Sequence, residues 1–213
     1  MSSLELAEEE IQVFVASLTV SDDKYSELEG TLCSEERGRA KNLAPILARR
    51  FVVARGMLRG LLSGFTGTAA ESLRFRYGTS GKPSLAGHEI QFNISHSAEV
   101  GLFAFAPDRP VGIDVENIRP VRRLLDVAQR FLSEDDVRSL AASPPDERDG
   151  TFLKAWVVRE ARLKAEGKGI WSGSEMHDSV TALTHKLFAP RPGYIAAVAA
   201  AGSDWRLYTC AMI

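Results

Sequence analysis

Cysteine is scarce in this sequence, with only Cys33 and Cys210 among 213 residues. Two isolated cysteines do not make a disulfide framework, and without a CxxC pair they do not indicate a zinc or redox centre. Reduced thiols in a reducing compartment are the expected state. The sequence also lacks an apolar run long enough to cross a bilayer. Its acidic first residues lack the basic-then-apolar pattern of a secretory signal. We therefore expect a cytoplasmic protein.

Neither sign of charge is in marked excess, because the formal net charge is only −2. Such a balance gives no bulk attraction to nucleic acid or to a membrane surface, so neither is expected as a partner. Any anion-binding site must therefore be local. With 45% hydrophobic residues, a chain of this length can bury a core without disulfides or a structural metal.

Helices and short strands follow one another in blocks, which favours an α+β fold. Apolar periodicity, N-cap residues and breakers predict strands at 11–18, 73–77, 90–94, 100–106, 112–117, 179–188, 194–202 and 205–213, and helices at 34–43, 45–65, 123–132, 133–142 and 147–167. The segment 105–112 contains two prolines and is the best candidate for a junction. We expect two similar α+β halves, residues 1–108 and 109–213.

The first candidate site is the strand at 112–117. Successive side chains of a strand point to opposite faces, so Asp114 and Glu116 share one face, roughly 7 Å apart along the strand. Ile113 and Val115 then face a core. Neighbouring carboxylates repel each other unless a cation or water separates them, and Mg²⁺ accepts such ligands together with waters and phosphate oxygens. An exposed edge strand with a solvated acidic face would give the same pattern.

The second candidate site lies on the helix at 147–167. Trp156, Glu160 and Lys164 are spaced four residues apart and form one stripe along this helix. Glu160 and Lys164 stand in the favoured order for an ordinary surface ion pair, which is the simpler interpretation. The bulky Trp156 and the apolar residues on neighbouring faces instead indicate a largely buried helix, where an unpaired carboxylate would be costly.

The third candidate site combines the Gly-Lys-Pro turn at 81–83, which presents Lys82, with a strand end that carries Ser95 and His96. Lysine, serine and histidine supply charge-assisted hydrogen bonds to phosphate oxygens. A lone histidine is equally compatible with a structural role. Most of the basic residues of the preceding helices fit a solvated face; the set is Arg37, Arg39, Lys41, Arg49, Arg50, Arg55 and Arg59.

In this order, four motifs resemble those of the 4′-phosphopantetheinyl transferase family, of the surfactin-synthetase-activating type. They are GKP at 81–83, FNISHS at 92–97, GIDVE at 112–116 and WVVREARLKAEGKG at 156–169. Each motif alone is weak, whereas all four in the family's order and at sensible separations are specific. The resemblance covers residues 81–169.

The resemblance implies a transferase that moves the 4′-phosphopantetheine group of coenzyme A onto a serine hydroxyl of an apo acyl, peptidyl or aryl carrier protein, releasing 3′,5′-ADP. It implies two halves related by a pseudo-twofold axis, with coenzyme A in the cleft between them. The first half would hold the nucleotide and the second the metal and the catalytic groups. Because both sides of such a cleft lie on one chain, we expect a monomer. Mg²⁺ is the implied ion, with Mn²⁺ as a possible substitute.

The same resemblance assigns roles to individual residues. Asp114, Glu116 and Glu160 match the family's metal ligands, and Glu160 also matches the base that takes the proton of the carrier serine. Lys164 matches the lysine that faces the coenzyme A phosphates. The residues matched to the 3′-phosphate of the nucleotide are Lys82, Ser95, His96 and, by its place in the preceding helix, Arg50.

One position departs from the family pattern, because Arg159 stands where lysine is usual. Adjacent helical residues lie about 100° apart, so Arg159 is expected off the stripe of Glu160, and no contact there is predicted. One alternative function is a different metal-dependent phosphoryl or nucleotidyl transferase, which the lack of a P-loop or kinase motif disfavours. Another is a non-catalytic module that binds coenzyme A or a carrier protein.

Overall fold

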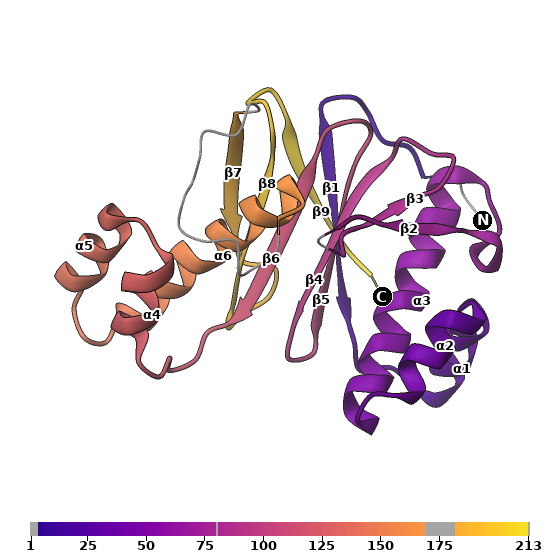
Figure 1. The fold of residues 1–213 in the computed structure, drawn as a ribbon, viewed down its shortest axis with the longest axis horizontal. Coiled ribbons are helices and arrows are strands. Elements are labelled where there is room, and N and C mark those ends of the chain that lie inside the picture. The colour runs from indigo at the N-terminus through magenta and orange to yellow at the C-terminus, as the bar shows by residue number, and fades with distance from the viewer. Residues whose placement is uncertain (1–3, 80, 169–181, 213) are drawn as a thin grey trace.

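The computed structural model describes residues 4–79, 81–168 and 182–212 (Figure 1). Its strands are β1 (Glu10–Ser17), β2 (Phe75–Tyr77), β3 (Pro83–Leu85), β4 (Gln91–Ser97), β5 (Val100–Ala106), β6 (Val111–Asn117), β7 (Leu183–Phe188), β8 (Tyr194–Ala201) and β9 (Arg206–Ala211). Its helices are α1 (Asp22–Gly30), α2 (Ser34–Lys41), α3 (Pro45–Thr66), the 3₁₀ turn η1 (Ala70–Ser72), α4 (Leu124–Phe131), α5 (Glu134–Ala142) and α6 (Arg148–Glu166). The α+β class predicted from the sequence is confirmed. None of the helices in these residues has the length and hydropathy needed to cross a membrane.

Two β-sheets form the centre of the molecule (Figure 1). The first has the strand order β4-β5-β1-β9, in which β1 is antiparallel to β5 and parallel to β9. The second has the order β6-β8-β7, with antiparallel neighbours throughout. A separate two-stranded hairpin, β2-β3, carries the Gly-Lys-Pro turn.

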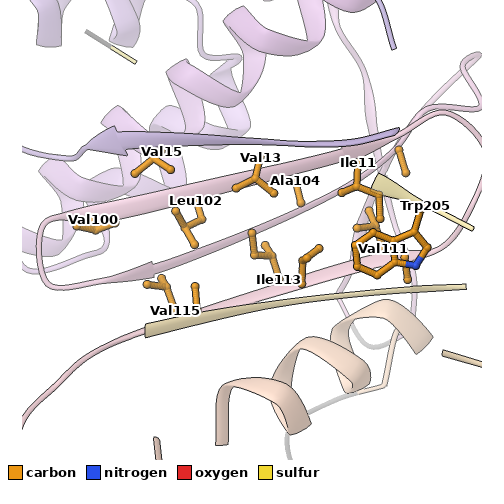
Figure 2. Packing of buried hydrophobic residues seen from close by; sticks show 14 of the residues in the cluster. Ile11, Val13, Val15, Val100, Leu102, Ala104, Val111, Ile113, Val115 and Trp205 are labelled. Carbon is orange, nitrogen blue, oxygen red and sulfur yellow. The ribbon is translucent and has the colours of Figure 1, made fainter. Parts of the chain in front are cut away.

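The inner faces of the two sheets pack against each other. Figure 2 shows Val13 and Leu102 of the first sheet facing Ile113 and Val115 of the second, and all four belong to one cluster of buried residues. Helix α3 covers the outer face of the first sheet, and α6 packs on β6 and β8 of the second (Figure 1). The molecule is therefore layered as helix, sheet, sheet and helix.

Gly112 is the residue that allows α6 to lie directly on β6. A Cβ atom at this position would lie 2.1 Å from Ala161 O and 2.3 Å from Ala165 N, both in the α6 backbone. Because backbone atoms cannot move aside as a flexible side chain can, any other residue would push the helix away from the strand. The close approach fixes the distance between the acidic strand and the helix that faces it.

The strand β9 belongs to the first sheet, although it comes late in the sequence. β9 pairs with β1 of the first sheet, with Val13 opposite Thr209. Without β9, β1 would be an open sheet edge with unpaired backbone groups. The Arg109 side chain further ties the junction to both ends of the chain by donating to Glu8 O, Ala201 O and Asp204 Oδ1. The division at 108/109 and the pseudo-twofold relation stay predictions.

The helix ends follow local sequence signals and lie within two residues of the predicted bounds, although α1 and η1 were not predicted. Helix α1 was not predicted, although Ser21 Oγ caps it by accepting from Lys24 N. Helix α2 begins at Ser34 as predicted, and its N-cap is Cys33, where Glu36 reaches back and accepts a hydrogen bond from Cys33 N. The long α6 ends as expected at Gly167, which has a positive φ of 67°.

Candidate active site

The acidic strand β6 alternates as predicted. Val111, Ile113 and Val115 lie in the core between the two sheets. Asp114 and Glu116 lie on the other face, where they meet polar side chains of β4 rather than solvent. The alternative of a solvated acidic edge is therefore wrong for Asp114, whose residue exposure is only 7%.

Asp114 is held by two donors from different elements. Its Oδ1 accepts from Ser95 Oγ at 2.9 Å and from Lys164 Nζ at 2.6 Å. Lys164 Nζ also donates to Ile113 O at 3.1 Å, so this lysine bridges α6 and β6. Burial raises the pKa of the Asp114 carboxyl, an effect that the Lys164 ammonium and the Ser95 hydroxyl partly oppose.

Glu116 lies nearer to the surface than Asp114. Ser97 Oγ donates to its Oε2 at 3.0 Å, and Arg119 Nη1 donates to the same oxygen at 2.9 Å. The spacing of Ser95 and Ser97 matches that of the two acids, so each serine of β4 meets one carboxylate of β6. A further polar residue of β4, Asn93, accepts from a β6 backbone N–H. The polar side of β4 thus joins the two sheets.

Glu160 faces this acidic strand from α6. It is buried, with a residue exposure of 3%, and the pKa of its carboxyl is raised first by burial and then by the nearby negative charge of Asp114. The predicted buried helix is confirmed. The prediction that Arg159 makes no contact is wrong, because Arg159 Nη1 donates to Glu160 Oε1 at 2.6 Å. Its long side chain spans the angle that separates adjacent residues.

The three carboxylates are close enough to influence one another, since the charges of Glu116 and Asp114 raise the pKa values of Asp114 and Glu160 respectively. Each carboxylate has a basic partner: Lys164, Arg119 and Arg159. Over the described ranges, no group of acidic, histidine or cysteine side chains is already arranged as a metal centre. The donor set nevertheless fits a hard divalent cation, which prefers carboxylate oxygens and would separate the mutually repelling charges.

Lys82 makes its two hydrogen bonds to backbone groups. Its Nζ donates to Val111 O at 3.0 Å and to Ala165 O at 3.1 Å. Burial lowers the pKa of Lys82 to about 8. The β2-β3 hairpin therefore reaches across to β6 and α6 at the point where they pack closest. Its assignment to the nucleotide phosphate stays a prediction, as does that of Ser95, whose hydroxyl bonds Asp114.

His96 and Arg50 lie on the α3 side of the same region. The His96 side chain is exposed, and the pKa of its imidazole is lowered by partial burial and by the positive charges of Lys164 and Arg50. The positive charges of Lys164 on α6 and Arg50 on α3 therefore both repel the charged form of His96 on β4. A phosphate anion between such groups would relieve that repulsion.

Two arginines assigned to a solvated face are instead buried. Arg55 and Arg59 both donate to Glu36, with Nε–Oε distances of 2.5 and 2.8 Å. The solvated interpretation is therefore wrong for these two residues. Acidic Glu36 in the preceding helix was the available signal, since a buried arginine requires an acceptor. The Glu116–Arg119 pair gave no such signal, because Glu116 lies in a strand, where residues three apart point to opposite faces.

The site therefore has the groups of an enzyme that handles a phosphate-bearing substrate: clustered carboxylates, a lysine among them and basic side chains alongside. The model of the 4′-phosphopantetheinyl transferase superfamily matches residues 110–206. The chain is 31% identical over 220 residues to the 4′-phosphopantetheinyl transferase HetI of Nostoc sp., covering 96% of this chain and 93% of that protein. It is 30% identical over 174 residues to the 4′-phosphopantetheinyl transferase Sfp of Bacillus subtilis, covering 74% and 76% respectively. The chain belongs to the 4′-phosphopantetheinyl transferase superfamily and to its Sfp-like type.

Proposed function

We propose that the chain transfers the 4′-phosphopantetheine group of coenzyme A to a serine hydroxyl of an apo carrier protein and releases 3′,5′-ADP. The observation that carries this proposal is the placement of Asp114 and Glu160 beside Lys164, with Glu116 next to Asp114, where α6 packs on β6, in a chain of this family. A module that only binds coenzyme A would not require buried carboxylates with raised pKa values.

Asp114, Glu116 and Glu160 are the residues proposed to hold Mg²⁺. When bound, the ion would offset the negative charge of the coenzyme A pyrophosphate during transfer. Mn²⁺ prefers the same oxygen ligands and would be a usable substitute. We therefore assign the metal-binding and catalytic residues to the half 109–213 and the nucleotide-binding residues to the half 1–108.

Glu160 is proposed as the base, because its buried carboxylate has a raised pKa and so holds a proton more readily than an exposed glutamate. The proton moves from the carrier serine to Glu160, directly or through a water, as the serine oxygen attacks the β-phosphorus. The bond from that phosphorus to the bridging oxygen breaks, and 3′,5′-ADP leaves with that oxygen. Lys164 supplies positive charge beside the reacting phosphates.

Arg50 and His96 are proposed to bind the 3′-phosphate, and the position of His96 supports this because the charges of both Arg50 and Lys164 act on its imidazole. Lys82 and Ser95 would also bind this phosphate, and each would give up a hydrogen bond to the protein when it does so. Both sides of this site come from one chain, which supports a monomer as the active form.

The segment 117–130 is proposed as the docking surface for the carrier protein. It contains the exposed arginines Arg119, Arg122, Arg123 and Arg130, which could meet an acidic carrier helix. Ile118 is 50% exposed beside them and lines a surface hollow of about 410 Å³. A solvated basic segment remains the alternative interpretation.

Mass spectrometry of an apo carrier protein, incubated with the chain, coenzyme A and Mg²⁺, tests the proposal. We expect the carrier to gain one phosphopantetheine and the reaction to stop when EDTA replaces Mg²⁺. Coenzyme A binding in calorimetry without any mass gain on acyl, peptidyl or aryl carriers would instead identify a non-catalytic module.

A further inference from the structure

Arg159 is an almost fully buried cation with one acidic partner. Its side chain is 14% exposed and that of Glu160 is 4% exposed, and the two are joined by the 2.6 Å hydrogen bond from Nη1 to Oε1. Such a bond between charged groups is stronger than one between neutral groups. Glu160 Oε2 takes no hydrogen bond from the residues that the structure describes, so the bond to Arg159 constrains one carboxylate oxygen and leaves the other for a ligand or a proton.

Two aromatic rings hold the guanidinium in this position. Its central carbon lies 5.3 Å from the centroid of the Phe131 ring and 5.7 Å from that of Trp156. Both distances are in the range of favourable cation–π contacts. Phe131 is the last residue of α4, whereas Trp156 lies one turn before Glu160 on α6. The arginine is therefore held from two different helices.

The rings are themselves fixed by packing. Trp156 stacks on Phe152 with ring centroids 5.6 Å apart, and Phe131 meets Trp156 edge to face at 6.1 Å. Phe152 belongs to the buried cluster that joins α4, α5 and α6. A rigid aromatic support of this kind limits the conformations of Arg159, which in turn limits those of Glu160.

Lysine would not reproduce this arrangement. A planar guanidinium can lie over aromatic rings and still present N–H groups in its own plane, whereas an ammonium is a compact, strongly hydrated charge. We propose that Arg159, supported by Phe131 and Trp156, is a positioning residue that sets the orientation of the Glu160 carboxylate for metal binding and proton transfer. This inference rests on the proposed function of Glu160.

Direct Mn²⁺ binding, followed by electron paramagnetic resonance, tests the proposal together with steady-state kinetics. Loss of a group that orients a metal ligand typically costs about tenfold to a hundredfold in metal affinity or activity. We expect Arg159→Met to weaken Mn²⁺ binding and to lower kcat by about these factors, with the KM for coenzyme A nearly unchanged. The Mn²⁺ affinity and kcat of Arg159→Lys should fall between those of Arg159→Met and of the unaltered protein, because a lysine keeps the positive charge but lacks the planar guanidinium.

Arg138→Lys is the matched control, since Arg138 pairs with Asp135 on α5 at the surface and is 71% exposed. It should leave Mn²⁺ binding and kcat unchanged. Phe131→Leu keeps the Arg159–Glu160 pair but removes one ring, and should weaken Mn²⁺ binding about threefold. If circular dichroism shows that Arg159→Met does not fold, the Mn²⁺ affinity of Phe131→Leu tests the proposal in its place.

The inference is overturned if Arg159→Met binds Mn²⁺ as tightly as the unaltered protein or more tightly. Tighter binding would mean that the guanidinium competes with the metal instead of orienting its ligand. Arg159→Lys behaving like the unaltered protein would also contradict it. These results leave the proposed function intact, whereas failure of the unaltered protein to modify any carrier would count against the function itself.

Discussion

Two buried networks of arginine, lysine and acidic side chains lie in this molecule, and they differ in how completely the acids are bonded. In the first, Glu36 accepts from Arg55 through Oε1 and from Arg59 and Cys33 N through Oε2. Burial alone would raise the pKa of Glu36, but the hydrogen bonds from Arg59 and Arg55 outweigh it and lower the pKa. This network is complete without a ligand.

The second network, around Asp114 and Glu160, has the opposite balance. Burial and the mutual repulsion of the carboxylates exceed the effect of Lys164 and Arg159, so both pKa values are raised. Similar residues therefore serve two purposes. A buried acid with enough donors joins helices together, whereas a buried acid with too few donors is prepared for a cation or a proton.

Removing an acid from the second network, around Asp114 and Glu160, should have the largest effect on activity. We expect Asp114→Ala or Glu160→Gln to lower kcat by at least about a thousandfold, because the metal ligand or base is lost. The fold should persist, because Lys164 keeps its hydrogen bonds to Ser95 Oγ and Ile113 O after the first change, and an amide oxygen can still accept from Arg159 after the second. Carrier modification measures the first effect and circular dichroism the second. Substantial transfer by either variant at saturating Mg²⁺ would refute the assignment of that residue.

Removing the acid from the first network, Glu36, should instead affect the stability of the fold. Glu36→Gln leaves two buried guanidinium groups without a counter-charge, and we expect it to lower the free energy of unfolding by about 3–5 kcal/mol in urea titrations. The kcat of the folded fraction should stay near its normal value. Glu27→Gln is the control, because its partner Lys24 is 46% exposed and such surface pairs contribute about 0–1 kcal/mol. An equal loss of unfolding free energy in Glu36→Gln and Glu27→Gln would contradict the structural role assigned to the first network.

The basic groups beside the site should discriminate between nucleotides. A charge-assisted bond to the 3′-phosphate is worth about 1.5–3 kcal/mol, or roughly tenfold to a hundredfold in affinity. We expect kcat/KM to favour coenzyme A over its 3′-dephospho analogue by that factor. His96→Ala or Arg50→Ala should shrink the preference, and the exposed His88→Ala should not. An equal loss for both donors would assign these residues to the fold or to the pyrophosphate.

The smallest expected effect is the contribution of Lys82 to the stability of the fold, which should depend on pH. Because burial lowers its pKa to about 8 from an unfolded value of 10.5, the folded chain favours the neutral amine. Unfolding then takes up a proton between these two pH values, so the contribution of Lys82 to stability rises with pH in that window. Relative to Lys82→Met, the unaltered protein should gain on the order of 2 kcal/mol between pH 8 and pH 10.5. A pH-independent difference in urea unfolding would refute the predicted burial.

Much of the candidate site was predictable from period and spacing. The two-residue alternation of β6 correctly separated Asp114 and Glu116 from the core residues between them. The four-residue spacing on α6 correctly placed Glu160 and Lys164 on one stripe, which now faces the acidic strand. Such local rules work because the geometry of a strand or helix fixes the direction of each side chain.

Contacts between distant segments were not predictable in this way. The Arg159 guanidinium lies over the ring of Phe131 of α4, a residue whose place relative to α6 no spacing rule describes. The buried positions of Arg55 and Arg59 depend on Glu36 in another helix. The pairing of β9 with β1 joins segments almost 200 residues apart in sequence. In each case the deciding partner is set by packing and not by the local chain.

By itself, the sequence determined the fold class, the order of most helices and strands, and which charged residues share a face, since these depend on local geometry and composition. It also contained the four motifs that indicated the family. Only the tertiary structure decided which acids receive enough donors and which do not. That balance depends on burial and on partners from other elements: Gly112 brings α6 onto β6, and Ser95 of β4 and Lys164 of α6 then both donate to Asp114.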